Sequence, residues 1–270
     1  MKGEGLTMRK YIYIFKSEIM SSLQYISNIL ISFLSYFMHF FIFFNLWNYI
    51  YNNPAELING YSKCQMIWYV VVTEIIYSVS GGRQLCRLIS EDVKSGNISY
   101  NMNKPYSYVG YRLFSHLGEG TIKLIIFLIL GGIIGLAFLG EIPNLNSIQF
   151  LIVIISIIFA IIIQSLFIIL IGLLSFIIED SNPVYWVYSK VILVLGVTFP
   201  IEFFPKAIQG IAKFSPINVV SYGPAKLFVD FEAKTAISIL VAQMIYLVIS
   251  YLLCMLMYNK GVKKLNVNGG

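Results

Sequence analysis

Residues 82–112 read GRQLCRLISEDVKSGNISYNMNKPYSYVGYR, the one long polar interruption between the apolar segments of this chain. The stretch holds five Lys or Arg residues against two acids, Glu91 and Asp92. In a membrane protein such a loop must lie in water, and its basic excess favours the cytoplasmic side. The sequence predicts a short helix over residues 87–93 that ends at Ser95-Gly96, and Pro105 prevents another before about residue 107. We interpret this helix as a contact site through which a soluble partner could move the membrane spans.

The rest of the chain consists mostly of apolar residues. Hydrophobic residues make up 58% of it, charged residues only 12%, and the mean hydropathy is +0.77, which excludes a soluble domain. Crossing a bilayer takes about 20 residues. Six segments are apolar enough, although the second and fifth are short: 28–51, 64–80, 113–139, 148–178, 184–199 and 236–258. The sequence therefore predicts an all-α integral membrane protein with six transmembrane helices, forming a single polytopic domain over residues 1–270.

Two further segments differ from the spans. In residues 8–25 a helical period places Ile12, Phe15, Ile19 and Leu23 on one face, which predicts an amphipathic helix lying in the membrane interface. The alternative is that this helix packs on other spans. Residues 200–235 contain half of the chain's eight prolines. This outer segment is too broken for one spanning helix and predicts short re-entrant helices that dip into the outer leaflet before the last span.

The distribution of positive charge predicts the orientation. Lys and Arg number four at the amino end, five in residues 82–112, one in the turn near residues 179–190 and three in the tail, against five in the outer segments. This bias places both termini in the cytoplasm. The net charge of +6 is spread over loop ends and is not interleaved with aromatic residues, so it indicates topology signals rather than a nucleic-acid surface.

No catalytic or metal-binding constellation is visible. The chain has no G-x-x-x-x-G-K-[ST], H-E-x-x-H or G-x-S-x-G pattern, so it offers no Walker loop, zinc-protease helix or hydrolase nucleophile. Three cysteines at different depths and two histidines lack metal-ligand spacing. His116 and Glu119 are the single acid–base pair near a membrane face, and we reject a lipid enzyme on that pair alone. We expect no cofactor in this chain and no enzyme activity of its own.

Polar residues within the apolar segments mark a possible translocation pathway. They are Glu74, His39 and Gln164. A carboxyl group at bilayer depth is costly, and by default it marks a pathway or a pair. Glu74 therefore either lines a translocation route, or it is protonated or bonded to His39 or another span and only orders the bundle.

The order of these features, together with three short motifs, resembles one family. Glu91, Ser95, Gly96, Ile98 and Pro105 match an acid-x-x-x-small-Gly-x-Ile phrase followed by x-Pro after the second span. A F-P-x-x-x-x-P block (199–205) and a S-P-I-N-V-V block (215–220) precede the last span. The whole chain resembles the membrane subunits of type 2 ATP-binding-cassette (ABC) exporters.

This resemblance implies a half-transporter. Two six-span subunits, identical or paired with a sister permease, would join two separate ATPase subunits that bind the ATP and Mg. The loop residues that would dock on the ATPase are Arg87, Glu91, Asp92, Ser95, Gly96 and Ile98, with the amino-terminal helix beside them. The outer segment would form a gate that includes Phe199, Pro200, Pro205 and Pro216. The missing Walker loop is then expected.

The resulting hypothesis is the permease subunit of an ATP-driven exporter in a bacterial cytoplasmic membrane. Family habit and the aromatic spans suggest an amphipathic or hydrophobic substrate, such as a drug, an antimicrobial peptide or a lipid-like compound. Two rivals are a secondary carrier or channel that uses Glu74, and a non-transporting membrane scaffold. An ATPase that co-purifies with the chain would separate the exporter from the carrier.

Overall fold

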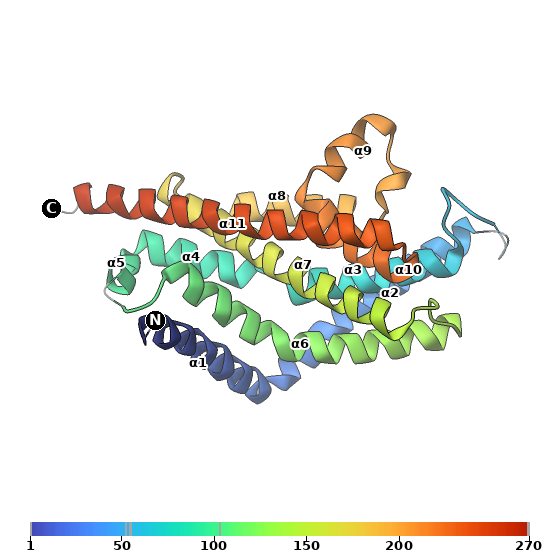
Figure 1. Cartoon of the computed structure of the whole chain (residues 1–270), viewed down its shortest axis with the longest axis horizontal. Helices are drawn as coiled ribbons and strands as arrows, with labels where there is room; N and C mark the ends of the chain where they lie inside the picture. The colour runs from blue at the N-terminus through green and yellow to red at the C-terminus, as the bar shows by residue number, and fades with distance from the viewer. Residues whose placement is uncertain (1, 52, 54–55, 103, 269–270) are drawn as a thin grey trace.

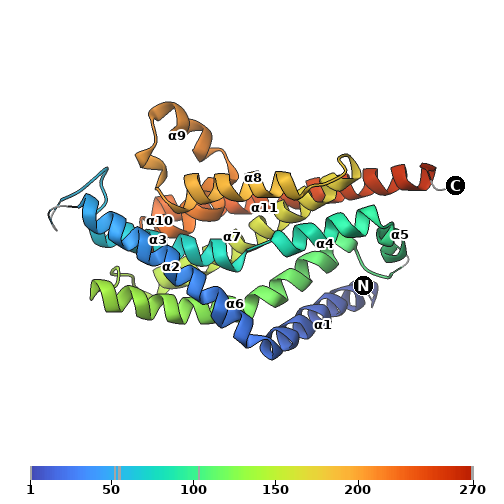
Figure 2. The ribbon, with the colours of Figure 1, turned by 180° about the vertical axis from the view of Figure 1, so that it is seen from behind.

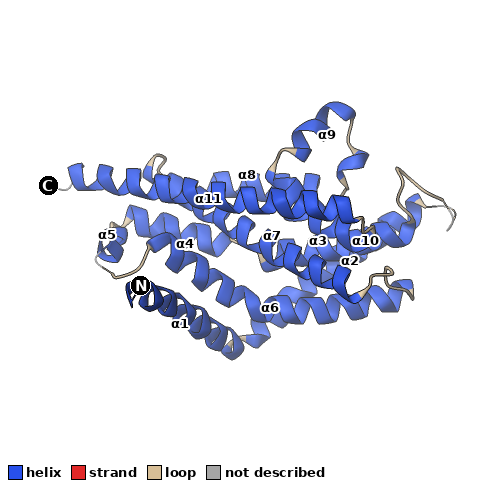
Figure 3. Ribbon diagram, in the orientation of Figure 1, coloured by secondary structure: helices blue, strands red, loops and turns tan. Residues whose placement is uncertain are grey.

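The computed structural model describes residues 2–51, 53, 56–102 and 104–268 and is an elongated bundle of helices (Figure 1). In this part of the chain no strand is formed (Figure 3), so the all-α class is confirmed. The α-helices are α1 (Lys2–Gln24), α2 (Ile26–Ile50), α3 (Lys63–Val79), α4 (Arg83–Lys94), α5 (Asn97–Met102), α6 (Tyr108–Leu139), α7 (Ser147–Leu173), α8 (Asn182–Ile192), α9 (Lys206–Lys213), α10 (Gly223–Val229) and α11 (Ala233–Asn268). The 3₁₀ segments are η1 (Leu174–Phe176) and η3 (Ile201–Phe203), and the π segments are η2 (Leu193–Val197) and η4 (Asn218–Tyr222).

Polar residues in the local sequence set several helix ends. Before α3, the hydroxyl of Ser62 accepts from the N–H of Gln65 at 3.3 Å, and the Gln65 side chain accepts from the N–H of Ser62 at 2.9 Å. Asn146 and Gln149 form the same reciprocal pair at the start of α7. α6 ends at Gly140, whose φ of 75° favours glycine. These ends satisfy backbone groups that no helix hydrogen bond reaches.

Four helices are long and apolar enough to cross a membrane, and this differs from the six predicted spans. They are Ile26–Ile50, Tyr108–Leu139, Ser147–Phe176 and Ala233–Lys263. α3 has 17 residues, and the apolar helix Asn182–Val197 is shorter than a full span. The expected fifth span is interrupted because η2 departs from α-helical geometry before Pro200.

α3 and α7 form the centre of the bundle. Every α3 residue from Met66 to Ile76 is buried, and α3 contacts α2, α6 and α10. α3 and α4 follow one another end to end along the bundle (Figure 2). A second buried cluster surrounds α4 and the end of α7. The predicted spans at 64–80 and 148–178 are thus the core against which the longer helices pack.

α1 packs along α6, as the alternative interpretation of the amphipathic helix required (Figure 1). The residues of the predicted apolar face differ in how far the bundle covers them. Phe15 and Ile19 are half-buried, whereas Ile12 and Leu23 are exposed. Glu18 takes a place on the packed face because its carboxylate accepts a hydrogen bond from the Ser115 hydroxyl at 2.7 Å. The contact with α6 therefore includes polar residues, which the spacing of apolar residues along the helix cannot reveal.

The two ends of the bundle differ. Both chain ends lie at the same end as α4 and α5, while the α2–α3 and α6–α7 connections lie at the other (Figure 1). The proline-rich residues 200–235 fold as the short helices η3, α9, η4 and α10, and α9 projects from the side of the bundle (Figure 1). Short helices in this segment match the sequence prediction.

The close approach of α3 and α6 at Gly135 predicts a selective loss of stability. A Cβ on Gly135 would overlap the ring of Trp68, which is held by a 2.9 Å hydrogen bond from its Nε1 to the carbonyl of Glu141. Gly135→Val should lower the free energy of unfolding by about 1–3 kcal/mol through overpacking.

Gly132→Val is the matched control, because a Cβ on Gly132 meets nothing within 4 Å. Thermal melting of the purified protein in detergent compares the two variants, which share any change in helix propensity. Equal melting temperatures for both would contradict this packing.

Candidate functional site

α4 is anchored by its apolar face. Leu85, Cys86, Ile89 and Val93 recur at helical spacing and are buried, with α7 as the main neighbour. The approach is close, because a Cβ on Gly172 of α7 would lie 2.9 Å from the Cβ of Ile89. Burial raises the pKa of the Cys86 thiol, which packs as an apolar side chain. This helix is therefore a packed part of the bundle and not a free loop.

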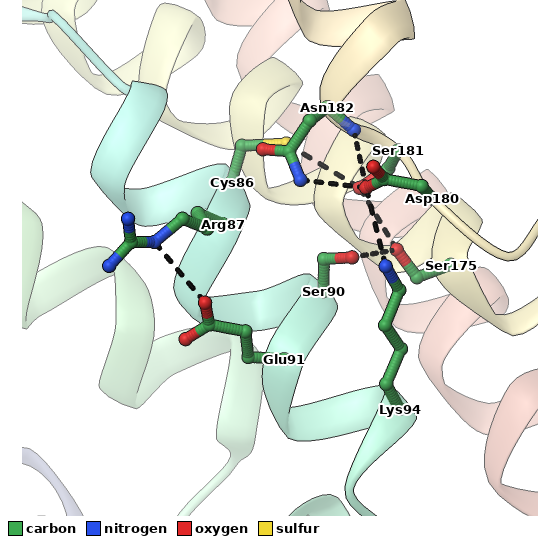
Figure 4. A network of polar contacts seen from close by, with 9 residues as sticks. All are labelled: Cys86, Arg87, Ser90, Glu91, Lys94, Ser175, Asp180, Ser181 and Asn182. Atoms are coloured by element: carbon green, nitrogen blue, oxygen red, sulfur yellow. Dashed lines mark hydrogen bonds and ion pairs between the residues drawn. The ribbon is translucent and has the colours of Figure 1, made fainter.

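A chain of hydroxyl groups joins α4 to the α7–α8 connection (Figure 4). The Ser175 hydroxyl lies 2.8 Å from that of Ser90 and 2.9 Å from that of Ser181. The ammonium of Lys94 lies 3.5 Å from a carboxylate oxygen of Asp180. The backbone and side-chain N–H groups of Asn182 lower the pKa of Asp180, which keeps this carboxyl ionised.

A charged cluster joins α4 to α6. The carboxylate of Asp92 pairs with the guanidinium of Arg112 and accepts a hydrogen bond from the hydroxyl of Tyr108 at 2.5 Å. Tyr108 in turn accepts from Nε of Arg112 at 3.2 Å. Only 14–15% of the Arg112 and Asp92 side chains is exposed, so water screens this pair far less than a surface pair. Asp92 therefore holds α4 against the base of α6.

The opposite face of α4 is free for contact. Nε of Arg87 lies 3.2 Å from a carboxylate oxygen of Glu91, and more than half of each side chain is exposed (Figure 4). The chain then turns at Gly96, whose φ is 74°, and enters α5. Within α5, Ile98 is fully buried, whereas Tyr100 is 71% exposed at the end of the bundle. The ammonium of Lys104 lies 4.9 Å from the centre of the Tyr100 ring.

The six predicted coupling residues thus reach one end of the bundle but play different structural parts. Arg87 and Glu91 lie on the exposed face, Asp92 and Ile98 are anchors, and Ser95-Gly96 forms the turn. α1 contacts the chain just beyond them, between α5 and α6. Its Lys10 ammonium donates to the carbonyl of Pro105 at 2.9 Å, and its Tyr11 hydroxyl accepts from the N–H of Ser107 at 2.9 Å.

The predicted pathway residues are only partly together. Nδ1 of His39 lies 3.6 Å from the carboxylate of Glu74, which is fully buried. In the described part of the chain this carboxylate has no hydrogen bond. Gln164 has another partner, because its side-chain oxygen accepts from the Tyr188 hydroxyl at 2.6 Å.

Sequence analysis missed three buried polar residues that serve the irregular helices. The Tyr69 hydroxyl donates to the carbonyl of Gly196 at 2.8 Å, and the Thr73 hydroxyl lies 3.1 Å from the carbonyl of Val197. The Gln243 amide donates to the carbonyl of Val219 at 2.8 Å. Gln243 could have been found by the same signal as Gln164, an amide inside an apolar run. The sequence around Tyr69 and Thr73 has no comparable feature that would mark them for this role.

Aromatic rings join the predicted gate residues to the rest of the bundle. Phe199 lies 5.8 Å from Trp47 and 6.2 Å from Phe203, measured between ring centres. Pro200 is buried beside this cluster, whereas Pro205 and Pro216 flank α9. The four predicted residues therefore divide between a packed cluster and the two ends of a projecting helix.

Among the residues that the structure describes, no group of three His, Cys, Asp or Glu side chains could hold a metal ion. A family model described as ABC-2 family transporter protein matches residues 33–269. The comparison with curated proteins found no match.

The Asp92 cluster predicts a loss of stability that its neighbour on the same helix does not share. Asp92→Asn leaves Arg112 without its counter-charge in a largely buried place. We expect the free energy of unfolding to fall by about 2 kcal/mol, the scale of a hydrogen bond to a charged group. Glu91→Gln removes an exposed pair and should cost less than about 0.5 kcal/mol.

Thermal melting in detergent, monitored by size-exclusion fluorescence, distinguishes these two variants. A melting temperature for Asp92→Asn equal to that of Glu91→Gln would show that α4 is not held through Asp92.

Proposed function

Because this chain belongs to the ABC-2 family of transporter membrane proteins, we propose that it is the permease subunit of an ATP-driven exporter. The chain is a multi-pass membrane protein, and the membrane proteins of its family lack ATPase activity of their own. ABC-2 permeases generally pair with ATP-binding subunits, so ATP and Mg belong to a partner. Two permeases, identical or sister chains, complete the proposed transporter.

We further propose six spans, with α3 and the Asn182–Val197 helix added to the four long ones. Both are apolar and run within the bundle, although each is short for a bilayer. Local thinning of the bilayer or neighbouring residues make up the difference. The end that carries α4, α5 and both chain ends is the cytoplasmic one, which agrees with the bias of positive charge. The membrane is a bacterial cytoplasmic membrane.

The observation that carries the proposal is the two-sided arrangement of α4. One side exposes Arg87 and Glu91, and α5 beside it exposes Tyr100. The other side is joined to α6 through Asp92 and to the α7–α8 connection through Ser90. An ATPase bound to the exposed side would move α4 together with the spans, because the anchored side resists separate motion.

The outer segment, residues 200–235, is the proposed gate. Ring contacts and not ion pairs join Phe199 to Trp47 and Phe203, so these contacts at the start of the segment can separate without breaking an ion pair. The proposed cargo is an amphipathic or hydrophobic compound such as a drug, an antimicrobial peptide or a lipid-like molecule.

A second candidate function is a secondary carrier, and one observation favours it. Glu74 is a buried carboxyl without a hydrogen bond in the described residues, next to a His39 that is 47% exposed. Such a pair could take up and release a proton during transport. This candidate requires flux that depends on Glu74 in the absence of an ATPase.

A pull-down from mild detergent tests the exporter. With the wild-type chain we expect an ATPase subunit to co-purify. Gly96→Pro should reduce its recovery at least about ten-fold, equivalent to 1.4 kcal/mol, because proline cannot adopt the φ of 74° found at Gly96. Glu91→Arg should do the same by reversing charge on the exposed face of α4. Glu56→Arg, an equal charge reversal in the α2–α3 connection, should leave recovery unchanged.

Absence of any ATPase with folded wild-type protein would contradict the exporter. Flux measured in proteoliposomes with wild type and Glu74→Gln would then test the secondary carrier.

A further inference from the structure

A groove of about 1130 Å³ lies between the α3–α4 junction and α8. It shares Arg87 with the exposed face of α4, and neither Tyr100 nor the outer segment lines it. Its lining includes three cationic side chains and three aromatic ones: Arg83, Arg87, Lys190, Tyr77, Tyr185 and Trp186. Cations beside aromatic rings, at the junction of an apolar helix with a polar one, suit a ligand that has both a charged and an apolar part.

The charge of this groove is positive. Among the described residues, Arg83 and Lys190 are exposed and form no ion pair. Arg87 is paired with Glu91 but remains 65% exposed. The acid in the lining, Asp180, is engaged by Asn182 and by Lys94 from outside the lining. Two cations are therefore left for an anionic ligand.

The start of α4 adds to this potential. Gly82 has no side chain to cap this helix, and Arg83 lines the groove. Backbone N–H groups at a helix start favour anions. The N–H of Gly82 itself is bonded to the Tyr185 hydroxyl at 3.2 Å. The start of α8 adds nothing, because the Asp180 carboxylate accepts from the N–H of Asn182 and the proline that follows has no N–H.

An apolar track leads away from the cations. Val187 and Val191 of α8 and Val194 of η2 recur at helical spacing, and each is 42–55% exposed. Trp186 stands at the start of this track and is 63% exposed. An acyl chain could follow this surface while its head group stayed at Arg83 and Lys190.

We infer that the groove between the α3–α4 junction and α8 binds the anionic head group of an amphiphile, with a phosphate between Arg83 and Lys190 and the tail along α8. This narrows the cargo of the proposed exporter to anionic amphiphiles and rests on that function for its role in transport. Binding itself requires no ATPase, so binding and transport can fail separately.

Trp186 provides the measurement. The chain has three tryptophans, and Trp47 and Trp68 are 1% and 3% exposed, so a quencher in the groove acts mainly on Trp186. The full chain is reconstituted in phosphatidylcholine vesicles, and brominated phosphatidylglycerol or brominated phosphatidylcholine is added. We expect stronger quenching by the anionic lipid. Trp186→Phe should remove this difference, which assigns the signal.

The charge variants decide the inference. Each basic residue near a lipid head group contributes about a five-fold preference for the anionic lipid. Arg83→Gln and Lys190→Gln should each reduce the preference by about that factor, and Arg83→Lys should keep most of it. Lys260→Gln removes one exposed charge elsewhere on the protein and should change nothing.

Three outcomes would overturn the inference. One is a preference unchanged in the Arg83→Gln/Lys190→Gln double variant that still elutes as folded protein. Another is an equal loss in Lys260→Gln, which would indicate attraction by the general surface charge. The third is equal quenching of the wild type by the two brominated lipids, in which case a change of Trp186 fluorescence on adding millimolar inorganic phosphate alone would assign the groove to a soluble anion and not to an amphiphile.

Discussion

A hydrocarbon interior offers no water to a backbone N–H or C=O group, and this constraint shapes every part of the bundle. In regular helices the backbone N–H and C=O groups bond to one another within the helix, and this satisfies the constraint. Where they depart from regularity, at η2 and η4, side chains from neighbouring helices take over. Tyr69 and Thr73 of α3 reach the carbonyls of η2, and Gln243 of α11 reaches a carbonyl of η4. These three buried polar side chains therefore support the backbone of the irregular segments and need no role in transport.

The same constraint explains why the polar contacts of α4 lie where they do. Charge is concentrated at the end of the bundle, where Asp92, Arg112 and Lys94 can be partly hydrated. Farther along, contacts between aromatic rings and small residues take over, as between Trp68 and Gly135. Ion pairs thus stabilise one end of the bundle, and close side-chain packing stabilises most of its length. A partner that binds at the charged end acts on the part that is tied most directly to several helices.

Sequence patterns predicted the all-helical class, a helix within residues 82–112 that ends near Ser95-Gly96, and the short helices among the prolines. They succeeded because apolar runs, glycine turns and proline breaks are local signals. They failed where the structure depends on distant partners. The contact of Asp92 with Arg112 spans 20 residues, and the contact of Glu18 with Ser115 spans 97. The apolar period of α1 likewise does not reveal the Glu18–Ser115 hydrogen bond on the side that meets α6.

The end-to-end arrangement of α3 and α4 has a mechanical consequence. At 1.5 Å per residue, their 17 and 12 residues give arms of roughly 26 and 18 Å on either side of Gly82. A Cβ on Gly82 would overlap Ile168 of α7, so this point is tightly held against a neighbouring helix. For a rigid pair, a displacement applied at α5 would be magnified about 1.4-fold at the far end of α3. Under that condition α3 and α4 turn together about Gly82, and motion at α5 is passed to the far end of α3.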